Sequence, residues 1–599
     1  MEKKDRRRGI LLAVLMVVLF SMIVVRLYWI QMVTVRSFSR EQADLLTQAQ
    51  EQQSKEYVVD SGRGTILDRT GRPLTGERGW RAIVFPLSEQ QVAANRSKMQ
   101  KLTSILGFSY PQLVRSVTKI QAPQALSSPE GEELLLTPSQ VEQIRKLKIP
   151  GVFVMQSDDR FSEHRPARQV IGRVERNPFW IKDRYPEEWA KGKYHSNSRV
   201  GVTGLESAFE PFLRGGEVRT FTYKKDGRGK PLNGFQVRVR EEKDGSAHRL
   251  VTTLDKDVQR AAEQALDAEG VKEGAVVVQD ISTGDVLAMA SRPGWEDGNS
   301  GQNPWDNRAL MEAVPGSIFK TVVAAAALDT GKVKPDETFV CKGELGRYGM
   351  RDPRPHGHGK QTFTEAYANS CNVVFAQVAE RIGGDTINQY ARKMGLGQQV
   401  MWKGPLDKEK EFRQLPREQT GMILSDPALL KDTGAVMQTA IGQRDVKMTP
   451  LQAANMVTAL FHRGKTPNPR IVKEIQDSNG KVIHRFPLHI LQADHPIGTR
   501  ALEQVRMMMR SAVIKGTAQS LQGAKWALAA KTGTAQVGPK ENRFNKWMIG
   551  FGPVERPIVV VSVVIRSVPD SKDIRAHTVF KRVMDGIASL EKTSTNRKS

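Results

Sequence analysis

Three short segments in the second half of the chain carry side chains that could perform acyl transfer. In the first, residues 315–320, Ser317 stands three positions before Lys320 and just ahead of an apolar run. Helical spacing in that run predicts a buried helix with Ser317 in its first turn and Lys320 on the same face. A serine becomes a nucleophile when a base takes its proton, and burial lowers the pKa of a lysine toward a neutral amine. The pair indicates a serine nucleophile with a lysine base, although Ser-x-x-Lys alone is more often a capping serine and a solvated lysine.

A second segment supplies a hydroxyl and an amide at the start of another apolar helix. Ser370, Cys371 and Asn372 precede an apolar run at residues 373–376. The hydroxyl of Ser370 could relay a proton, and the amide of Asn372 could orient a substrate. Taken alone, these residues are more simply explained as a helix N-cap with ordinary neighbours.

The third segment, residues 531–534, reads Lys-Thr-Gly-Thr within a strand-like run. On an edge strand, Lys531 and the threonine hydroxyls could bind a carboxylate that lies against the backbone. Gly533 would allow this close approach because it has no side chain. An exposed strand with a bulge explains the segment equally well when it is taken alone.

The order of the three segments is more specific than any one of them. Motifs of the form S-x-x-K, S-D-N and K-T-G are the signature of β-lactamases and penicillin-binding proteins. Each segment also falls in the predicted element that the signature requires: a helix start, a helix-opening loop and a strand. Chance is therefore a poor explanation of the combination.

The sequence resembles the class B penicillin-binding proteins over most of residues 57–590. The stretches that carry the likeness are 63–69, 168–172, 201–206, 274–293, 307–309, 441–452, 516–518 and 547–553. The first three are similar to the family's pedestal motifs and the others to its transpeptidase domain. No glycosyltransferase-like segment precedes the pedestal, which favours class B over the bifunctional class A. Ile318 stands where the family usually has Thr or Val, and no repeated wall-binding module follows the transpeptidase-like domain.

The resemblance implies a peptidoglycan D,D-transpeptidase that β-lactams inhibit covalently. Lys320 would deprotonate Ser317 for attack on the carbonyl between the two terminal D-alanines of a stem peptide, and an amine of a neighbouring stem peptide would resolve the acyl-enzyme. Backbone N–H groups of Ser317 and Thr534 would form the oxyanion hole. The implied catalytic residues are Ser317, Lys320, Ser370, Asn372 and Lys531, and the implied substrate-binding residues are Thr532, Gly533 and Thr534. The resemblance implies neither a cofactor nor a metal.

Two other kinds of function stay open. A D,D-carboxypeptidase or a β-lactamase would pass the acyl group to water on the same fold. A penicillin-sensing receptor or a scaffold of the wall-synthesis complex would make catalysis secondary. The expected partners are peptidoglycan stem peptides, β-lactams, the cytoplasmic membrane and a glycosyltransferase.

The charge balance favours an anionic neighbour without identifying it. The chain has 90 Lys and Arg against 65 Asp and Glu, a net charge of +25. Nucleic acid, phospholipid head groups and acidic wall polymers all fit such a balance. The excess is spread along the chain without a zinc-finger or helix-turn-helix signature, so the charge alone does not support a nucleic-acid partner.

The N-terminus predicts a membrane anchor. A basic head at residues 1–9 precedes an apolar run that extends, interrupted by Arg26, to Ile30. A helix over residues 10–30 would be about 30 Å long, enough to cross the hydrocarbon layer. The basic cluster predicts that the head stays inside the cell and that the rest of the chain lies outside. A cleaved signal peptide is the alternative, but no small-x-small cleavage site follows the run.

The elements that must position these groups predict an α+β fold. Strand-like runs near 275–289 and 547–565 flank helical material, which favours an antiparallel sheet sandwiched by helices. Between residues 57 and 249 we expect an elongated mixed α/β pedestal with short strands and no long periodic helix. The predicted divisions are a head (1–9), an anchor (10–30), a stalk (31–56), a pedestal resembling the family's dimerisation domain (57–249), a transpeptidase domain (250–591) and a disordered tail (592–599).

Cys341, Asp352, His356 and His358 fall close together in the sequence before Ser370. His356 and His358 could bind zinc with their neighbours. A mobile loop near the entrance of the active site, with a half-buried unpaired Cys341, is the favoured interpretation. Cys371 is expected to fill a small space in the core.

Overall fold

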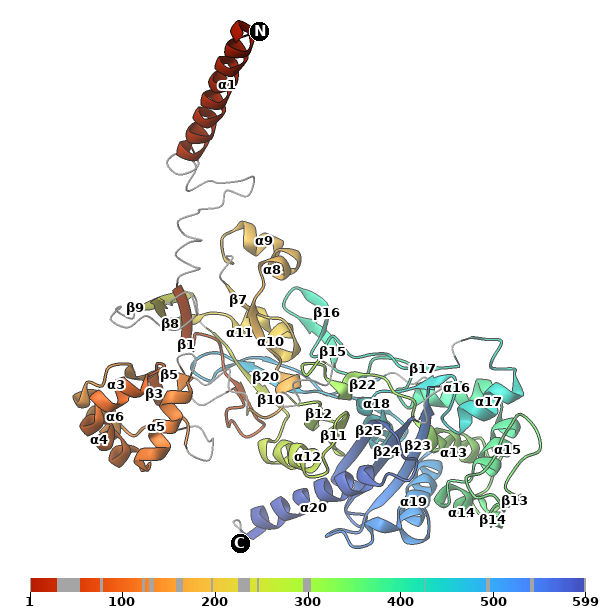
Figure 1. Cartoon of the computed structure of the whole chain (residues 1–599). Helices are drawn as coiled ribbons and strands as arrows, with labels where there is room; N and C mark the ends of the chain where they lie inside the picture. The colour runs from red at the N-terminus through yellow and green to blue at the C-terminus, as the bar shows by residue number, and fades with distance from the viewer. Residues whose placement is uncertain are drawn as a thin grey trace. The chain divides into compact units, whose positions relative to one another are not determined.

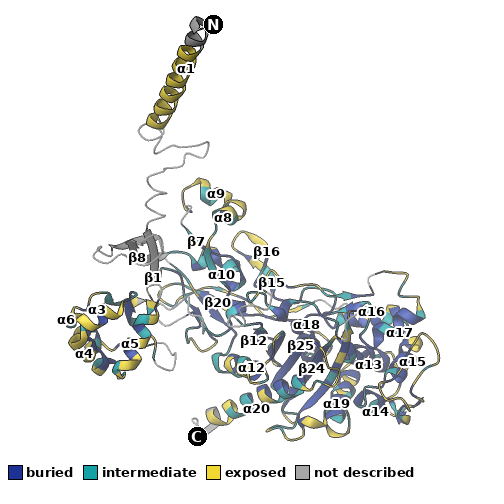
Figure 2. Ribbon diagram, in the orientation of Figure 1, coloured by how far each residue is buried: buried dark blue, intermediate teal, exposed yellow. Residues whose placement is uncertain are grey.

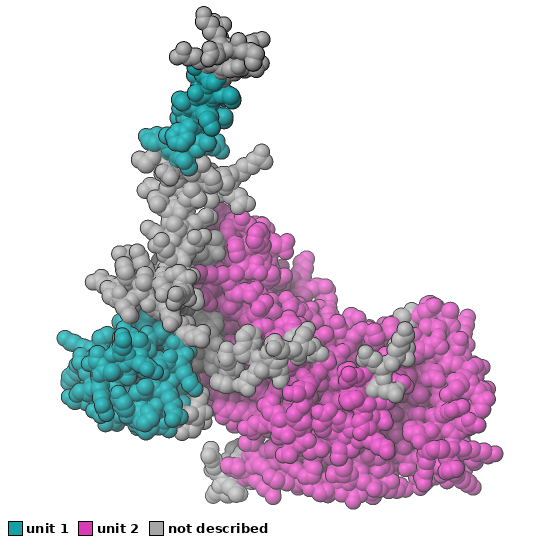
Figure 3. Space-filling view, in the orientation of Figure 1, with its two compact units in different colours: residues 1–62, 78–159, 217–244 teal, residues 63–77, 160–216, 245–599 magenta. Residues whose placement is uncertain are grey.

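A computed structural model of the chain forms two compact units (Figure 3). Unit 1 comprises residues 1–62, 78–159 and 217–244, and unit 2 comprises residues 63–77, 160–216 and 245–599. The structure describes residues 2–29, 54–75, 79–120, 124–128, 134–157, 165–194, 198–224, 238–244, 247–294, 303–424, 426–491, 496–538 and 543–596. Residues 30–53, which include the last residue of the predicted anchor and most of the predicted stalk (31–56), lie outside these ranges.

Helix α1 (Glu2–Tyr28) matches the predicted anchor. Its segment Gly9–Tyr28 has a mean hydropathy of 2.9 and buries none of its surface against the protein. The residues of this segment are exposed (Figure 2), and most of them have large apolar side chains. A helix of this length and composition is a candidate membrane span.

Unit 1 contains a small helical layer on a three-stranded sheet. Strand β3 (Gly79–Val84) lies between β4 (Gln124–Ala125) and β5 (Val152–Ser157). The helices are α3 (Glu89–Ala94), α4 (Arg96–Leu106), α5 (Tyr110–Lys119) and α6 (Pro138–Leu147), and a second sheet joins β1 (Ser54–Ser61), β8 (Gly216–Lys224) and β9 (Arg238–Asp244).

The region for which we expected short strands and no long periodic helix also contains three helices of ordinary length. Helices α4, α5 and α6 have 11, 10 and 10 residues, and each buries a narrow apolar stripe, such as Met99 and Leu102 of α4. The other positions of these helices are mostly polar or charged, so a stripe only one or two residues wide per turn is easily missed in the sequence. Capping boxes at Ser109 and Thr137 fix where α5 and α6 begin.

Unit 2 is built on a five-stranded antiparallel sheet in the order β12-β11-β25-β24-β23 (Figure 1). The strand-like segment predicted near 275–289 forms the antiparallel pair β11 (Gly274–Asp280) and β12 (Val286–Arg292). The later strands are β23 (Ala529–Val537), β24 (Arg543–Gly552) and β25 (Val559–Val568). Because β25 pairs with β11, the two ends of the predicted domain form one sheet.

Helices cover both faces of this sheet. Val276, Val278 and Val561 face one core with α12 (Lys256–Ala268) and α20 (Arg575–Asn596). Their neighbours Val277 and Val560 face the other core, which includes α13 (Lys320–Asp329) and α18 (Pro450–Thr458). This period of two is what a sheet buried on both faces requires. The predicted sandwich is therefore confirmed.

The catalytic motifs lie around the second core. A 3-10 turn, η3 (Gly316–Phe319), leads into α13, in which every residue from Lys320 to Leu328 is buried. A helix that is buried on all sides lies within a core rather than on a surface. The surrounding elements are β13 (Thr338–Cys341), β14 (Gly359–Thr362), α14 (Phe363–Ala368), α15 (Asn372–Ile382), α16 (Gly384–Lys393), α17 (Thr433–Ala440) and α19 (Thr499–Lys515).

Parts of the predicted pedestal share the catalytic core. Ile66, Val170, Leu205 and Phe209 are fully buried in the same apolar cluster as α13. Strand β2 (Ile66–Leu67) also joins a sheet with β10 (Arg249–Thr252), β20 (Val472–Gln476) and β21 (Val482–Arg485). The predicted segment 57–249 thus contributes to both compact units.

The end of the chain departs from the prediction. Helix α20 continues to Asn596, into the segment 592–599 for which we expected a disordered tail. Helical spacing of apolar residues stops near Leu590, but the exposed residues Glu591, Lys592 and Thr593 continue the helix without being buried.

Candidate active site

Ser317 lies in the η3 turn, which packs against strand β23. The preceding Gly316 has φ +58°, and a Cβ atom there would lie 2.4 Å from the carbonyl oxygen of Thr534. A Cβ on Gly533 would likewise lie 2.8 Å from the carbonyl oxygen of Pro315. Two glycines therefore let the serine turn and the Lys-Thr-Gly-Thr strand touch through their backbones. This contact brings the first and third motifs together.

Lys320 is completely buried and points at the second motif. Its Nζ donates to the carbonyl oxygen of Ser370 at 2.5 Å and to Oδ1 of Asn372 at 2.7 Å, and lies 3.4 Å from the hydroxyl of Ser370. The ring of Phe375 lies 5.4 Å away. A neutral amine has two N–H donors and one lone pair. The two short hydrogen bonds use both donors, so the lone pair stays available to accept a proton.

Burial lowers the pKa of Lys320 from 10.5 to about 7, although Cys371 and Asp352 act in the opposite direction. Taking a charged amine out of water disfavours the charged form. A substantial fraction of the Lys320 amine is consequently neutral near neutral pH, which is the state that a general base requires.

A second buried lysine completes the link between the motifs. Lys531 donates from Nζ to the hydroxyl of Ser370 at 2.8 Å and to the carbonyl oxygen of Thr532 at 3.0 Å. Burial lowers its pKa well below the usual value, and the charge of Lys320 adds to that shift. Because the Ser370 oxygen accepts from Lys531, its own hydrogen is free to point elsewhere. The hydroxyl is thus arranged as a donor.

Ser370 adopts a backbone conformation that is rare for a residue with a side chain. Its φ is +59°, in the left-handed region. Such a conformation costs about 1–3 kcal/mol and persists where the surroundings fix it. The turn places the Ser370 carbonyl on Lys320 and its hydroxyl on Lys531 at the same time.

Asn372 begins helix α15 and is hydrogen bonded to the loop that contains Arg351 and Asp352. Its backbone N–H donates to Oδ2 of Asp352 at 2.9 Å, and its Nδ2 donates to the carbonyl oxygen of Arg351 at 3.0 Å. Because the amide nitrogen faces a carbonyl, the amide oxygen must face Lys320. The loop around Asp352 therefore fixes the orientation of the asparagine.

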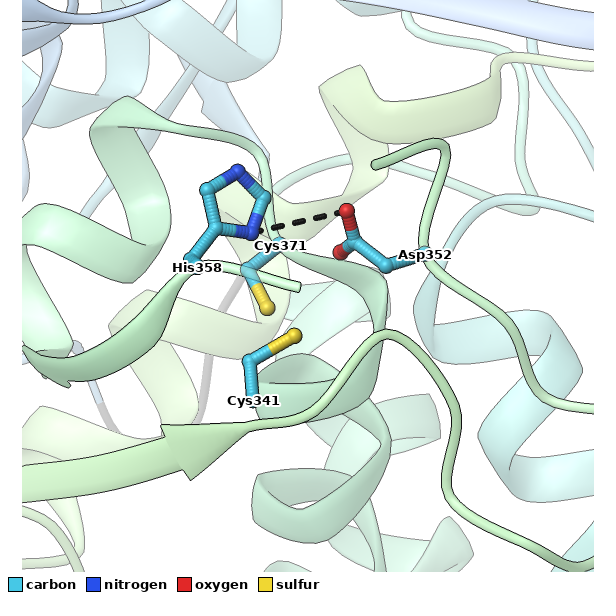
Figure 4. A group of neighbouring side chains, drawn as sticks. All are labelled: Cys341, Asp352, His358 and Cys371. Carbon is cyan, nitrogen blue, oxygen red and sulfur yellow. Dashed lines mark ion pairs between the residues drawn. The ribbon is translucent and has the colours of Figure 1, made fainter. Parts of the chain in front are cut away.

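Asp352 also belongs to a group of four side chains next to the second motif (Figure 4). Cys341, Asp352, His358 and Cys371 each offer one metal-binding atom, and these atoms all lie within 4.8 Å of one another. Cys341, which we expected to be half-buried, is buried. His356, which the sequence analysis had grouped with them, is exposed and takes no part.

The threonines of the third motif lie on the outer edge of the sheet. Thr532 Oγ1 is 2.7 Å from Thr517 Oγ1, and the exposed Thr534 accepts from Nζ of Lys546 at 2.8 Å. Lys546 lies directly opposite Thr534 on β24. The sequence analysis did not select Lys546, because a lysine in a strand of alternating residues is ordinarily solvated.

The structure brings all eight predicted site residues into one region, from three distant segments. Lys320 and Lys531 are 0% exposed and point at Ser370, rather than into solvent. The Ser317 hydroxyl is half-buried and makes no hydrogen bond within the described ranges of the chain. Catalytic hydrogen bonds are often long without substrate, so this geometry is compatible with the predicted role of Ser317. The individual roles stay predictions.

Charged side chains of the pedestal form two separate groups in unit 2. Arg63 binds Glu206 at 2.9 Å and Glu210 at 2.6 Å, and all three side chains are buried. Asp68 binds Arg72 at 2.8 Å, and Arg72 reaches Asp257 on α12 at 2.7 Å. Arg69 is exposed. The sequence analysis missed Glu210, Arg72 and Asp257, which have no motif to distinguish them.

Comparison with known proteins gives the same family for both halves of the chain. Residues 274–585 match the penicillin binding protein transpeptidase domain, and residues 58–250 match the penicillin-binding protein dimerisation domain. Stage V sporulation protein D of Bacillus subtilis is 29% identical over 584 residues, covering 94% of this chain and 81% of that protein. Peptidoglycan D,D-transpeptidase MrdA of Acinetobacter baumannii is 24% identical over 552 residues, covering 84% of this chain and 77% of that protein.

Solved structures share the fold. One is a complex between penicillin-binding protein PBP2 and MreC from Helicobacter pylori; its matching chain has a TM-score of 0.57 and 22% identity, and the match covers 90% of this chain and 99% of that chain. Another is a peptidoglycan synthase complex that coordinates polymerization and crosslinking, with a TM-score of 0.61 and 24% identity over 97% of this chain and 98% of that chain. With a transpeptidase match over more than half of its length, behind a dimerisation-domain match, the chain belongs to the penicillin-binding protein transpeptidase family and has the organisation of a class B member.

Proposed function

We propose that this chain is a peptidoglycan D,D-transpeptidase in which Ser317 is the nucleophile and Lys320 its base. The observation that carries the proposal is the buried amine of Lys320, whose two short hydrogen bonds and lowered pKa leave a lone pair for a proton. A serine one helical turn away on the adjoining η3 segment is the nearest predicted nucleophile.

In the first half-reaction, Ser317 attacks the carbonyl carbon between two terminal D-alanines while its proton moves to Lys320. The N–H groups of Ser317 and Thr534 bind the oxyanion, an interaction worth about 3 kcal/mol per donor in comparable enzymes. Ser370, whose hydroxyl oxygen accepts from Lys531, gives its proton to the nitrogen of the leaving D-alanine and is reprotonated by Lys320, which thereby becomes neutral again. The C–N bond breaks and an ester with Ser317 forms.

The second half-reaction reverses these roles with a new amine. An amino group of a neighbouring stem peptide attacks the ester, loses a proton to the same lysine–serine relay, and forms the cross-link as Ser317 leaves. Asn372 holds the substrate amide, and Thr532, Gly533 and Thr534 hold the terminal carboxylate with Lys531. A β-lactam carries a carboxylate and a strained amide in the same relation and would acylate Ser317 by the same route.

Helix α1 and the structurally similar proteins support a location and a set of partners for the enzyme. The basic head and the unburied apolar helix support a single span, with the catalytic domain outside the cytoplasmic membrane. One structural relative is seen with MreC, and another is a complex that couples polymerization to crosslinking. We therefore propose a scaffold protein and a membrane glycosyltransferase as partners.

The test is covalent labelling of the purified full-length chain in detergent with a fluorescent penicillin. We expect the wild type to be labelled at Ser317 and Ser317→Ala to take up no label. Ser282, an exposed serine in the β11–β12 turn, gives a matched control: Ser282→Ala should label like the wild type. Persistent labelling of Ser317→Ala would show that another residue is the nucleophile.

The fate of the acyl-enzyme distinguishes a transpeptidase from a hydrolase. With a stem-peptide substrate and an added acceptor amine, we expect cross-linked product to exceed hydrolysed product. Slow release of bound penicillin is also expected, because the site favours an amine over water in the second half-reaction. Rapid turnover of penicillin would instead identify a β-lactamase.

A further inference from the structure

A cleft of about 600 Å³ lies beside helix α19 in unit 2. Side chains of α19 form one wall, and the other consists of Phe461 in the turn η4 (Ala459–Phe461), Phe551 near the end of β24 and the β24–β25 turn. Figure 1 shows α19 alongside the central sheet. Clefts that hold small molecules have volumes of about 300–1,000 Å³. None of the predicted site residues lines this cleft, so it is a second candidate site.

The walls of the cleft are mainly apolar. Phe461, Phe551 and Val554 line it opposite α19, on which Met507 and Ile514 are 63% and 52% exposed. A stable interface between two proteins buries about 800 Å² on each partner. Two exposed apolar side chains supply only a small part of such an area, so the cleft fits a small ligand better than the surface of another protein.

Arg506 is a half-buried cation at this cleft, and its counterion is weakly held. Its side chain is 29% exposed, and its guanidinium carbon lies 4.9 Å from the centre of the Phe461 ring. The ion pair with Glu503 spans 3.7 Å, which is too long for a hydrogen bond. Within the described ranges of the chain, the Arg506 guanidinium makes no hydrogen bond. Burial lowers the pKa of Arg506, and Glu503 offsets this only in part. An anion that replaced the lost water would relieve the cost of this burial.

The other charges of the cleft are mostly positive. Arg510 and Lys515 also line it, and Glu503 is the one acidic residue of the lining, so three cations and one anion leave an excess of two positive charges. Arg510 donates to the carbonyl oxygen of Leu528 at 2.8 Å, and Lys515 donates to Glu365 at 3.2 Å. An apolar cleft with this excess is complementary to a molecule that has an apolar body and a negative group.

We propose that the cleft binds a small organic carboxylate with an apolar body. The planar guanidinium of Arg506 can donate two parallel hydrogen bonds to a carboxylate. The apolar body would lie against Met507, Ile514 and Phe551, where it removes apolar surface from water. A neutral molecule of the same shape lacks the first contribution, and the excess of positive charge repels a cation.

The end of α19 connects this cleft with two of the catalytic motifs. The backbone N–H of Thr517 donates to the carbonyl oxygen of Ala368 at 3.0 Å, and the Thr517 hydroxyl oxygen lies 2.7 Å from that of Thr532. Gly516 packs so closely that a Cβ there would lie 2.2 Å from the same Ala368 oxygen. Ala368 stands two residues before Ser370. The segment after α19 therefore touches both the second and the third motif.

The expected effect of a bound carboxylate on catalysis rests on the proposed function. The cleft and the contacts of Thr517 with both motifs occur together in the structure. A ligand that fits the cleft in this form favours the conformation in which those contacts are made. We therefore expect an occupied cleft to accelerate acylation of Ser317 by about fivefold, the lower end of allosteric couplings.

Equilibrium dialysis tests binding to the full-length chain in phosphatidylcholine nanodiscs, with 2-naphthylacetate as the probe and empty nanodiscs as the blank. We expect one saturable site with a Kd of about 100 µM, which is attainable for a molecule of this size. The neutral 2-naphthylethanol should bind about tenfold more weakly. Arg506→Met should weaken binding of the acid about tenfold and leave binding of the alcohol unchanged. Arg500→Met, at an exposed position of α19 outside the cleft, should bind like the wild type.

Three results would overturn the carboxylate site: equal affinity of the wild type and Arg506→Met, equal affinity for acid and alcohol, or no saturable binding up to about 1 mM. Val554→Trp, which would fill the cleft, should weaken binding of both molecules, and unchanged binding would place the probe elsewhere. Ser317→Ala should bind the probe like the wild type, so the result does not depend on the identity of the nucleophile.

Penicillin labelling with saturating 2-naphthylacetate tests the coupling to the active site. The labelling rate should rise about fivefold in the wild type and stay unchanged in Arg506→Met. Competition of the probe for the carboxylate subsite at Thr534 would instead slow labelling in both proteins alike. Slower labelling in both, or no change in the wild type, would overturn the coupling. Loss of the Ser317 label without the probe would concern the proposed function.

A separate observation concerns Lys546, and its interpretation also rests on the proposed function. Lys546 is 7% exposed and donates to Thr534 Oγ1 at 2.8 Å and to the carbonyl oxygen of Ser571 at 2.7 Å. Since the Thr534 oxygen accepts from Lys546, the Thr534 hydrogen points away from it. We infer that Lys546 is a positioning residue that makes Thr534 a hydrogen-bond donor for the carboxylate of the substrate.

A double-mutant cycle on penicillin acylation tests the role of Lys546. Lys546→Met should weaken the initial penicillin complex about tenfold and leave the following acylation step nearly unchanged, because the carboxylate contact is made in both states. In a Thr534→Val background the same change should have no further effect, and Lys546→Arg should recover part of the loss. Additive effects of the two changes would overturn the inference.

Discussion

At the scale of single residues, the site depends on two buried lysines whose amines have no carboxylate hydrogen bonded to them among the residues that the structure describes. Carbonyl, amide and hydroxyl oxygens accept their hydrogen bonds, and these neutral groups supply no opposite charge to offset the cost of burying a charged amine. Burial then disfavours the charged form of each amine, so the pKa values of Lys320 and Lys531 both fall. A nearby carboxylate acceptor would have kept the lysines protonated and unable to act as bases.

The lowered pKa of Lys320 predicts how acylation depends on pH. Its amine is protonated and inactive as a base below its pKa of about 7, and neutral above it. The rate of penicillin acylation should therefore rise with pH around a midpoint near 7, by about tenfold between pH 6 and pH 8 for one titrating group. Stopped-flow labelling at constant ionic strength measures this.

Lys320→Arg is the control for that profile, because a guanidinium is not deprotonated in proteins. The variant should be at least about 100-fold slower at every pH and show no rise near pH 7. An unchanged profile in Lys320→Arg would assign the titration to another group.

At the scale of elements, the site is the meeting point of a 3-10 turn, a helix start and an edge strand. The η3 turn touches β23 through Gly316, and the start of α15 touches α13 through Lys320. None of these contacts is local in sequence, since they join residues near 317, 372 and 533. The placement of the nucleophile therefore depends on how closely two backbones approach.

Gly316→Ala should slow acylation because its Cβ would lie 2.4 Å from the Thr534 carbonyl oxygen. The turn or the strand would have to shift by several tenths of an ångström or more. Misplacement on the scale of 1 Å can cost about 100-fold in rate, so we expect a loss of about 10- to 100-fold. The second-order rate constant for penicillin labelling is the measurement.

Gly331→Ala separates this clash from backbone strain. Gly331 follows α13 and has φ +66°, close to that of Gly316, but nothing lies within 4 Å of a Cβ there. Its substitution should lower stability slightly and leave the labelling rate within about twofold of the wild type. Equal losses in the two variants would attribute the effect to strain.

At the scale of the whole molecule, the membrane anchor and the catalytic site belong to different compact units, and the pedestal is divided between them. Unit 2 contains the whole candidate site together with pedestal segments 63–77 and 160–216. Arg63, Glu206 and Glu210 join these segments by a buried ion cluster. Burial alone would lower the pKa of Arg63, but the two carboxylates outweigh it and raise that pKa.

Removing the charge of Arg63 should destabilise unit 2 without changing its chemistry. In Arg63→Met, two buried carboxylates lose their cation, which costs about 3–5 kcal/mol. We expect a lower melting temperature and, well below it, an unchanged rate of penicillin labelling. Arg69→Met, at an exposed position of the same segment, should melt like the wild type. A slower label in folded Arg63→Met would connect the cluster to catalysis.

The anchor predicts how the chain partitions between membrane and solution. The full-length chain should stay with membranes after a wash in 1 M salt, because α1 is held by apolar burial rather than by charge. A chain lacking residues 1–29 should be soluble and label with penicillin at the wild-type rate. Release of the full-length chain by salt would mean that its net charge, and not α1, holds it there.

The sequence by itself determined the local part of this protein: the apolar anchor, the strand-like runs near 275–289 and 547–565, and the three motifs in their order. These depend on spacing and residue type within short segments. The tertiary structure alone decided how Lys320 and Lys531 share Ser370, that Lys546 contacts Thr534, and that Cys371 joins a cluster without His356. Such contacts join residues far apart in the chain, and no periodicity or motif encodes which of many lysines or histidines the folded core brings together.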